Sequence, residues 1–162
     1  MLREKGRPVE RFDGALAKLA DDMLQTMYEA PGVGLAGPQV GVPLRLIVFD
    51  DGSGPRKLAN PEIFDLEGEQ VMDEGCLSIP GLYFPVKRAS SLRAVGFEMD
   101  GTRVEFEATD FLARILQHET DHINGILFID RLSAEDRREA MRMLREQEIG
   151  SNLGEARPSR SL

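Results

Sequence analysis

The sequence predicts one α+β domain in which antiparallel strands pack around a central buried helix, with further helices near both ends. Three observations predict this class. Residues 13–30 have the apolar period of an amphipathic helix, residues 44–108 hold short strand-like segments between turns, and residues 110–124 form an unusually apolar helical segment. No repeat or linker separates these blocks, so we expect a single domain over residues 1–149 and a flexible tail over residues 150–162.

The first predicted helix is amphipathic. Its apolar residues recur every three or four positions, which places them on one helical face. They are Leu16, Leu19, Ala20, Met23, Leu24 and Met27. Pro31 and Gly32 end the helix, because proline and glycine both interrupt the helical pattern.

The middle of the chain has strand patterns. Segments 44–49, 57–65 and 69–78 are short and lie between glycine-containing turns. Asp100-Gly101 separates segments 92–99 and 102–108, and this dipeptide between alternating segments is a strong hairpin signal. We therefore expect antiparallel pairing across residues 92–108.

The central helix is expected over residues 110–124, with Asp110 as its N-cap and Asn124-Gly125 as its stop. Its apolar residues cover more than one stripe, which indicates a helix that runs through the interior. A last helix begins after Ser133. Its expected apolar edge consists of Ala140, Met141 and Leu144.

Composition excludes several classes of protein. The formal net charge is −8, which argues against DNA or an anionic membrane as a non-specific partner. No apolar run approaches the roughly 18 residues of a membrane span, and the charged first residues lack the apolar stretch of a signal peptide. The single cysteine excludes an internal disulfide and fits a reducing compartment. We therefore expect a cytoplasmic protein.

The only two histidines, His118 and His122, lie four residues apart on the central helix, with Glu119 between them. This spacing places both imidazoles on one face, close enough to hold one metal ion. The alternative is a pair of surface or hydrogen-bonded core histidines. A catalytic site needs a third protein ligand and an open fourth position for water. Candidates for that ligand are Cys76 and a downstream carboxylate, Glu135 or Glu139.

Two further segments suit such a site. Residues 73–80 surround Cys76 with Gly75, which allows an unusual backbone path, and with Leu77, whose amide is a hydrogen-bond donor. A buried cysteine with no role beyond packing is the alternative. Residues 31–41 place glycines around one amide side chain, Gln39. Such a segment lets a substrate backbone approach closely, and otherwise forms a tight turn.

Three segments together, 32–39, 74–78 and 117–122, resemble the signature motifs of peptide deformylases in the same order. The resemblance extends from about Leu2 to Ser133. It implies a metal held by Cys76, His118 and His122, and removal of the formyl group from the initiator methionine of new proteins.

The expected roles follow from position and from this resemblance. Glu119, between the two histidines, is expected to act as general acid and base. By resemblance, the Leu77 amide and the Gln39 side chain stabilise the oxyanion, and Glu74 pairs with Arg88 to brace the Cys76 segment. Substrate contacts are expected from Val33, Gly34, Phe111 and Ile115. Asp121 is either a partner of a metal-bound histidine or a solvated carboxylate.

One thiolate and two imidazoles accept Fe²⁺, Zn²⁺, Ni²⁺ or Co²⁺, and the resemblance favours Fe²⁺. N-formylmethionyl nascent peptides are the expected partners. The arginines of the last helix also suggest docking on the ribosome near the exit tunnel, although the interspersed acids favour a solvated surface.

Two other functions remain open from the residues alone. One is a zinc peptidase that uses a downstream glutamate as its third ligand. The other is a non-catalytic module that binds metal or the ribosome. Glu119 argues against the second, because metal affinity alone does not need it.

Overall fold

The computed structural model describes residues 3–76 and 79–151, and of residues 76, 79, 80 and 151 it describes the backbone alone. The chain has the predicted α+β class. Its elements are α1 (Gly14–Glu29), β1 (Gly34–Ala36), the 3₁₀ helix η1 (Gly37–Val40), β2 (Leu46–Phe49), β3 (Arg56–Glu67), β4 (Gln70–Cys76), β5 (Ile79–Arg88), β6 (Ser91–Phe97), β7 (Arg103–Thr109), α2 (Asp110–Ile123), the 3₁₀ helix η2 (Phe128–Arg131) and α3 (Ala134–Ser151). None of the described helices is both long and apolar enough to cross a membrane.

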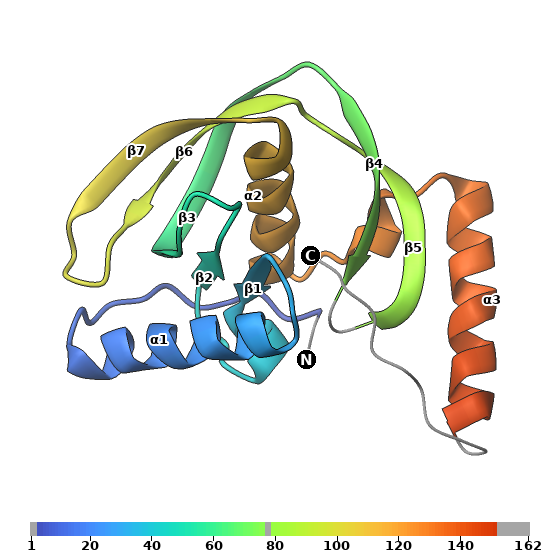
Figure 1. Cartoon of the computed structure of the whole chain (residues 1–162), viewed down its shortest axis with the longest axis horizontal. Coiled ribbons are helices and arrows are strands. Elements are labelled where there is room, and N and C mark those ends of the chain that lie inside the picture. Colours follow the sequence, from blue (N-terminus) through green and yellow to red (C-terminus); the bar gives the residue numbers. More distant parts are fainter. Residues whose placement is uncertain (1–2, 77–78, 152–162) are drawn as a thin grey trace.

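Two antiparallel sheets surround α2. The larger has the strand order β1-β2-β3-β6-β7, and the smaller is the β4–β5 ribbon. Figure 1 shows α2 between the curved large sheet and this ribbon, with α1 running below. The predicted hairpin is confirmed as β6–β7 around Asp100-Gly101. The central helix is therefore enclosed by strands, as its apolar composition predicts.

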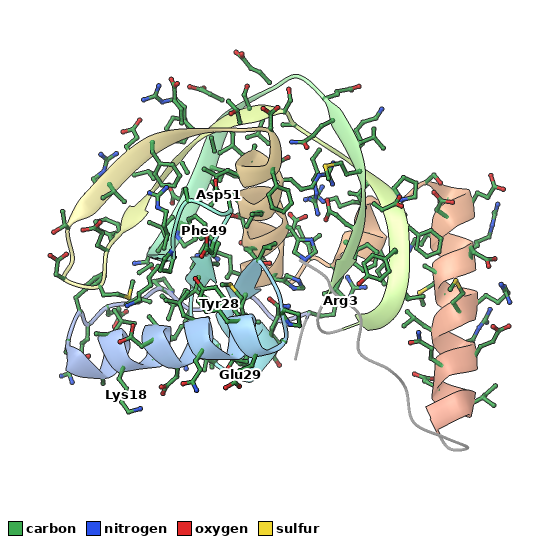
Figure 2. The ribbon with its side chains drawn as sticks, in the orientation of Figure 1. Arg3, Lys18, Tyr28, Glu29, Phe49 and Asp51 are labelled. Carbon is green, nitrogen blue, oxygen red and sulfur yellow. The ribbon has the colours of Figure 1, made fainter. Side chains whose placement is uncertain are left out.

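Strand β2 separates two parts of the core. Ile47 and Phe49 pack with α2, whereas Leu46 and Val48 pack with α1. All four side chains are at most 1% exposed, which explains why β2 is apolar at successive positions. Tyr28, labelled in Figure 2 at the end of α1, also donates a hydrogen bond to Asp50 Oδ2 at 2.6 Å. This bond holds α1 next to the turn that follows β2.

A third apolar cluster joins α3 to β5 and η2. It contains Leu82, Phe84, Val86, Leu127, Phe128, Ile129 and Ala140. The expected apolar edge of α3 is corrected at one position, because Met141 is 44% exposed while Met143 and Leu144 pack with Ala140. Positions 140, 143 and 144 share one helical face by their spacing of three and four. Helix α3 lies at the side of the molecule beside β5 (Figure 1).

Two strands lie outside the predicted set. β1 forms within the glycine segment that was considered as a tight turn, and it pairs with β2 at the edge of the large sheet. β5 contains Pro80, Gly81 and Pro85, which usually interrupt strands. It still alternates, with Leu82, Phe84 and Val86 buried. Its pairing with β4 therefore stabilises a segment that has poor local strand signals.

The ends of two helices differ from the prediction. The N-cap of α2 is Thr109, and the predicted cap, Asp110, is wrong because Asp110 is the first helical residue, with φ 52°. Its N–H donates to the Ser90 carbonyl at 2.8 Å, so the entry to α2 is held by the connection between β5 and β6. Helix α3 includes Gly150 and Ser151. The rest of the expected tail, residues 152–162, lies outside the described residues.

The other end of α2 is held firmly. Gly125 follows the C-cap with φ 76°, and its N–H donates to the His122 carbonyl at 3.1 Å. The N-terminal segment crosses this end, where the Gly6 N–H donates to the Ile123 carbonyl at 2.7 Å. A Cβ on Gly125 would overlap the Arg3 carbonyl group, so this crossing requires glycine. His122 therefore lies in a well-fixed last turn.

Candidate metal centre

The two imidazoles face each other on α2. His118 and His122 are each 1% exposed, and their Nε2 atoms are 3.2 Å apart. Two nitrogens bound to one ion at about 2.0–2.1 Å with a tetrahedral angle would be about 3.3–3.4 Å apart. The observed separation fits a shared metal ion. Glu119 completes the cluster of ligand atoms within 4.8 Å of one another, and its Oε1 is 3.9 Å from His118 Nε2.

The orientation of the His118 ring and the protonation state of His122 suit a metal. Glu74 Oε1 is 2.7 Å from His118 Nδ1, so Nδ1 donates to the carboxylate and Nε2 keeps its lone pair toward His122. Burial, with smaller contributions from His118 and Arg88, lowers the pKa of His122 to about 3. His122 is therefore a neutral imidazole near pH 7, which is the form that binds a metal.

Glu74 is the buried carboxylate that orients His118. Arg88 donates to both of its oxygens at 2.9 Å, and Arg114 Nη1 donates to Oε2. Burial alone would raise the pKa of Glu74, but hydrogen bonds from His118 and Arg88 outweigh that effect and lower it to about 2. The carboxylate is therefore ionised near pH 7, as an acceptor for the imidazole N–H must be.

Asp121 belongs to the same buried network. Arg88 Nη1 donates to its Oδ2 at 2.6 Å, and Arg131 donates to both oxygens at 3.1 and 2.8 Å. At 7% exposure Asp121 is not a solvated carboxylate, so that alternative is wrong. Its charge instead balances the two arginines, one from β5 and one from η2.

Glu119 differs from these carboxylates. It is fully buried, and neither of its oxygens has a hydrogen-bond partner among the described residues. Burial, followed by the negative charge of Glu74, raises its pKa well above the usual range. A buried polar group without a partner is costly, and such groups occur where a ligand or a reaction uses them. Glu119 is therefore suited to exchange protons with a bound molecule.

Strand β1 lies directly against Glu119. A Cβ built on Gly34 would stand 3.0 Å from the Cγ, Cδ and Oε1 atoms of Glu119. The absence of a side chain on Gly34 therefore lets the Glu119 side chain lie close to the strand, and this contact was not predicted from the sequence.

We expect Gly34→Ala to push the Glu119 carboxylate away. The variant should have a lower kcat than the wild type, with little change in its melting temperature. Steady-state kinetics and thermal unfolding of the metal-loaded protein measure the two effects. Gly14→Ala is the matched control, because a Cβ there meets no atom within 4 Å. Equal kcat for both variants would contradict the contact.

The remaining candidates of the glycine segment and of α2 lie nearby. Gln39 Oε1 accepts a hydrogen bond from the Ala36 N–H at 2.8 Å, which fixes the orientation of the amide. Val33 and Phe111 are half-buried against the core cluster around α2. Ile115 is fully buried within that cluster. Val33 and Phe111 thus keep some exposed surface, whereas Ile115 packs in the core.

The two kinds of candidate for the third ligand, the cysteine and the downstream glutamates, differ in what the structure describes of them. Cys76 ends β4 two residues after Glu74 and pairs through its backbone with Ile79. Its side chain and the whole of Leu77 lie outside the described part of the chain. Glu135 and Glu139 are exposed on α3, and Glu139 pairs with Arg142. The ligand cluster among the described residues includes no residue of α3.

Two buried polar residues of α2, Arg114 and Gln117, were not predicted from the sequence to have a role at the site. Arg114 is fully buried, and Gln117 pairs with both backbone groups of Ala89 at 2.9 Å. The one available signal was a charged residue one turn before His118 in a helix of apolar character. Both side chains join α2 to the β4–β5 ribbon.

Comparison with known proteins identifies the family. The family model described as polypeptide deformylase matches residues 1–138. The chain belongs to the peptide deformylase family. A peptide deformylase of Acidothermus cellulolyticus is 51% identical over 148 residues, which are 91% of this chain and 82% of that protein.

Solved peptide deformylases have the same fold. The enzyme from Legionella pneumophila matches with a TM-score of 0.86 and 43% identity, covering 95% of this chain and 93% of that one. The enzyme from Synechococcus elongatus, solved in complex with actinonin, matches with a TM-score of 0.82 and 40% identity. That match covers 88% of this chain and 81% of the other.

Family membership establishes the reaction. The chain is a hydrolase of a metal-dependent family, and it removes the N-formyl group from formylmethionyl nascent polypeptides. A zinc peptidase with a ligand from α3 and a non-catalytic module are therefore both wrong.

Proposed function

We propose that this deformylation takes place at a metal centre formed by Cys76, His118 and His122. The observation that carries the proposal is the pair of buried Nε2 atoms 3.2 Å apart, oriented by Glu74. Cys76 follows Glu74 by two residues on the same strand, and this position supports its assignment as the third ligand. We further propose Fe²⁺ as the native ion, since a thiolate with two imidazoles suits Fe²⁺ as well as Zn²⁺, Ni²⁺ or Co²⁺, and resemblance to the family favours iron.

Glu119 is proposed to move the protons. When bound, the ion lowers the pKa of water from about 15.7 toward 7 and polarises the formyl oxygen. Glu119 takes one proton from the attacking water as the water oxygen bonds to the formyl carbon. As the carbon–nitrogen bond breaks, Glu119 gives that proton to the leaving methionine nitrogen. The second proton of the water stays on the product, which forms as formic acid and gives this proton to solvent on release as formate. The absence of a described hydrogen-bond partner for its oxygens supports this role.

The negative charge that forms on the formyl oxygen needs donors. We assign this role to the Gln39 side chain and the Leu77 amide. The bond from the Ala36 N–H to Gln39 Oε1 supports the assignment, because it directs the NH₂ end, a hydrogen-bond donor, to the other side of the amide. Such a donor contributes about 3–4 kcal/mol to transition-state stabilisation in comparable sites.

The substrate side chain needs an apolar surface. We propose that Val33 and Phe111, both half-buried, contact the methionine, with Ile115 supporting them from the core. Gly34 lies beside Glu119 and is proposed to limit the space near the formyl carbon. A formyl group has hydrogen where an acetyl group has methyl, so a tight wall there would favour formyl by steric overlap.

The setting of the reaction follows from its substrate. We propose that the enzyme works in the cytoplasm, where formylated nascent chains are made. Contact with the ribosome near the exit tunnel is a separate proposal that rests on the exposed arginines of α3. Arg142 pairs with Glu139 and Glu146, so the charge of this arginine is balanced within the helix.

The direct test is formate release from formyl-Met-Ala-Ser by protein loaded anaerobically with Fe²⁺. We expect turnover of this peptide and a kcat/KM about 10–200-fold lower for acetyl-Met-Ala-Ser, in line with discrimination of one methyl-sized group. Treatment with a chelator should abolish turnover, and added Fe²⁺ should restore it. Equal cleavage of both peptides, or turnover that survives metal removal, would contradict the proposed centre.

A further inference from the structure

Arg114 is a fully buried guanidinium to which the proposed mechanism gives no role. It lies on α2 four residues, about one helical turn, before His118, and its exposed fraction is 0%. Arginine is almost never fully buried unless its charge is paired and its N–H groups have acceptors. The identity of those acceptors therefore indicates what the residue does.

The acceptors of Arg114 all lie on the β4–β5 ribbon. Nη1 donates to Glu74 Oε2, and Nη2 donates to the carbonyl oxygens of Val86 at 2.9 Å and Gln70 at 3.3 Å. Nε donates to the Gln70 side-chain oxygen at 3.3 Å. One side chain of α2 is thus bonded to both strands of the ribbon and to the carboxylate that orients His118.

These contacts complete the surroundings of Glu74. Arg88 donates one hydrogen bond to each oxygen, and His118 Nδ1 donates the second bond to Oε1. Arg114 donates the second bond to Oε2. Four donors in fixed positions leave a carboxylate little freedom to rotate. Without Arg114, Oε2 keeps a single partner, and the plane of the carboxylate can tilt away from His118.

Simple attachment of the ribbon to α2 does not require Arg114. Gln117, one position before His118, already pairs with the N–H and the carbonyl of Ala89 at the end of β5, both at 2.9 Å. The distinctive contact of Arg114 is the one to Glu74. Arg114 therefore contacts both the ribbon and the carboxylate, whereas the described contacts of Gln117 attach the chain next to the ribbon without reaching Glu74.

We propose that Arg114 is a positioning residue of the metal centre, which fixes the Glu74–His118 hydrogen bond by holding the Glu74 carboxylate, two residues before Cys76 on β4. The inference rests on the proposed function, because it assumes that His118 and Cys76 bind the same ion. Arg114 touches neither the ion nor the substrate, and it acts through Glu74. Its loss should therefore change how the ion is held more than how the peptide binds.

The test compares Arg114→Met with Met23→Ala in the Co²⁺-loaded full-length protein. Met23 is a buried residue of α1 in a different part of the core, so its truncation lowers stability without touching Glu74. Transfer of Co²⁺ to a chelator, followed at a temperature where all variants are folded, gives the release rate. For Arg114→Met we expect release about 10-fold faster than in the wild type, the lower end of the range for loss of an outer partner of a ligand, because Arg114 acts through the outer partner Glu74. Met23→Ala should release at the wild-type rate.

Two further readouts separate positioning from stability. Arg114→Met should shift the visible absorption of bound Co²⁺ and lower kcat, with KM within about twofold of wild type. Arg114→Lys keeps the charge and one reachable acceptor, so its release rate should fall between those of wild type and Arg114→Met. If Arg114→Met does not fold, the same comparison uses Arg114→Lys, with several-fold faster release expected.

The possible failures are distinguishable. A wild-type protein that binds no Co²⁺ through its thiol and imidazoles would contradict the proposed metal centre itself. A normal wild-type centre, with the Arg114 variant that folds matching Met23→Ala in release rate and spectrum, would overturn the positioning role alone.

Discussion

Replacing Glu119 by alanine is expected to lower kcat by about 10²–10⁴-fold, the usual contribution of a general acid and base. The carboxylate is buried beside the paired imidazoles, and its oxygens have no hydrogen-bond partner among the described residues. No other described carboxylate is placed to replace it, because Glu74 and Asp121 are bound by arginines. Formate release at saturating formyl-Met-Ala-Ser measures the loss.

The same variant should keep its metal. Glu119 is proposed to act on protons and not as a ligand, so metal content per chain should equal that of the wild type. Glu139→Ala is a suitable control, since Glu139 is exposed on α3 and pairs only with its own helix in the described contacts. Normal turnover of Glu119→Ala would contradict the acid–base role, whereas loss of the metal would indicate that Glu119 is a ligand.

Replacing Cys76 by alanine is expected to abolish both tight metal binding and deformylation. Losing a direct ligand should cost more than the about 10–100-fold in affinity that loss of an outer partner costs. Metal content after dialysis against a chelator that leaves the wild type loaded measures the effect. Met72→Ala on the same strand is the control, because Met72 is 46% exposed. Metal and activity both retained in Cys76→Ala would exclude the thiolate as a ligand.

Much of the fold was predictable because its signals are local. Helix α1 follows from its apolar period, and the β6–β7 hairpin follows from Asp100-Gly101. β5 was not predictable, because Pro80, Gly81 and Pro85 suggest turns, and only pairing with β4 stabilises the strand. The N-cap of α2 was misplaced because a contact with the connection between β5 and β6, at the Ser90 carbonyl, holds the entry to the helix.

The candidate site divides in the same way. The facing imidazoles follow from a spacing of four residues on one helix, which needs no tertiary information. Arg114 looks like a surface residue in the sequence, and its burial depends on the β4–β5 ribbon folding over α2. The prediction for Gly34 was incomplete for a similar reason. Its contact with Glu119 joins residues 85 positions apart, and no local pattern encodes it.

The most direct test of the metal centre is X-ray absorption at the zinc edge of the zinc-loaded protein. Our account predicts one sulfur at about 2.3 Å and two imidazole nitrogens at about 2.0–2.1 Å, with the remaining position taken by a light atom. A first coordination sphere of nitrogen and oxygen alone, with no sulfur, would contradict it.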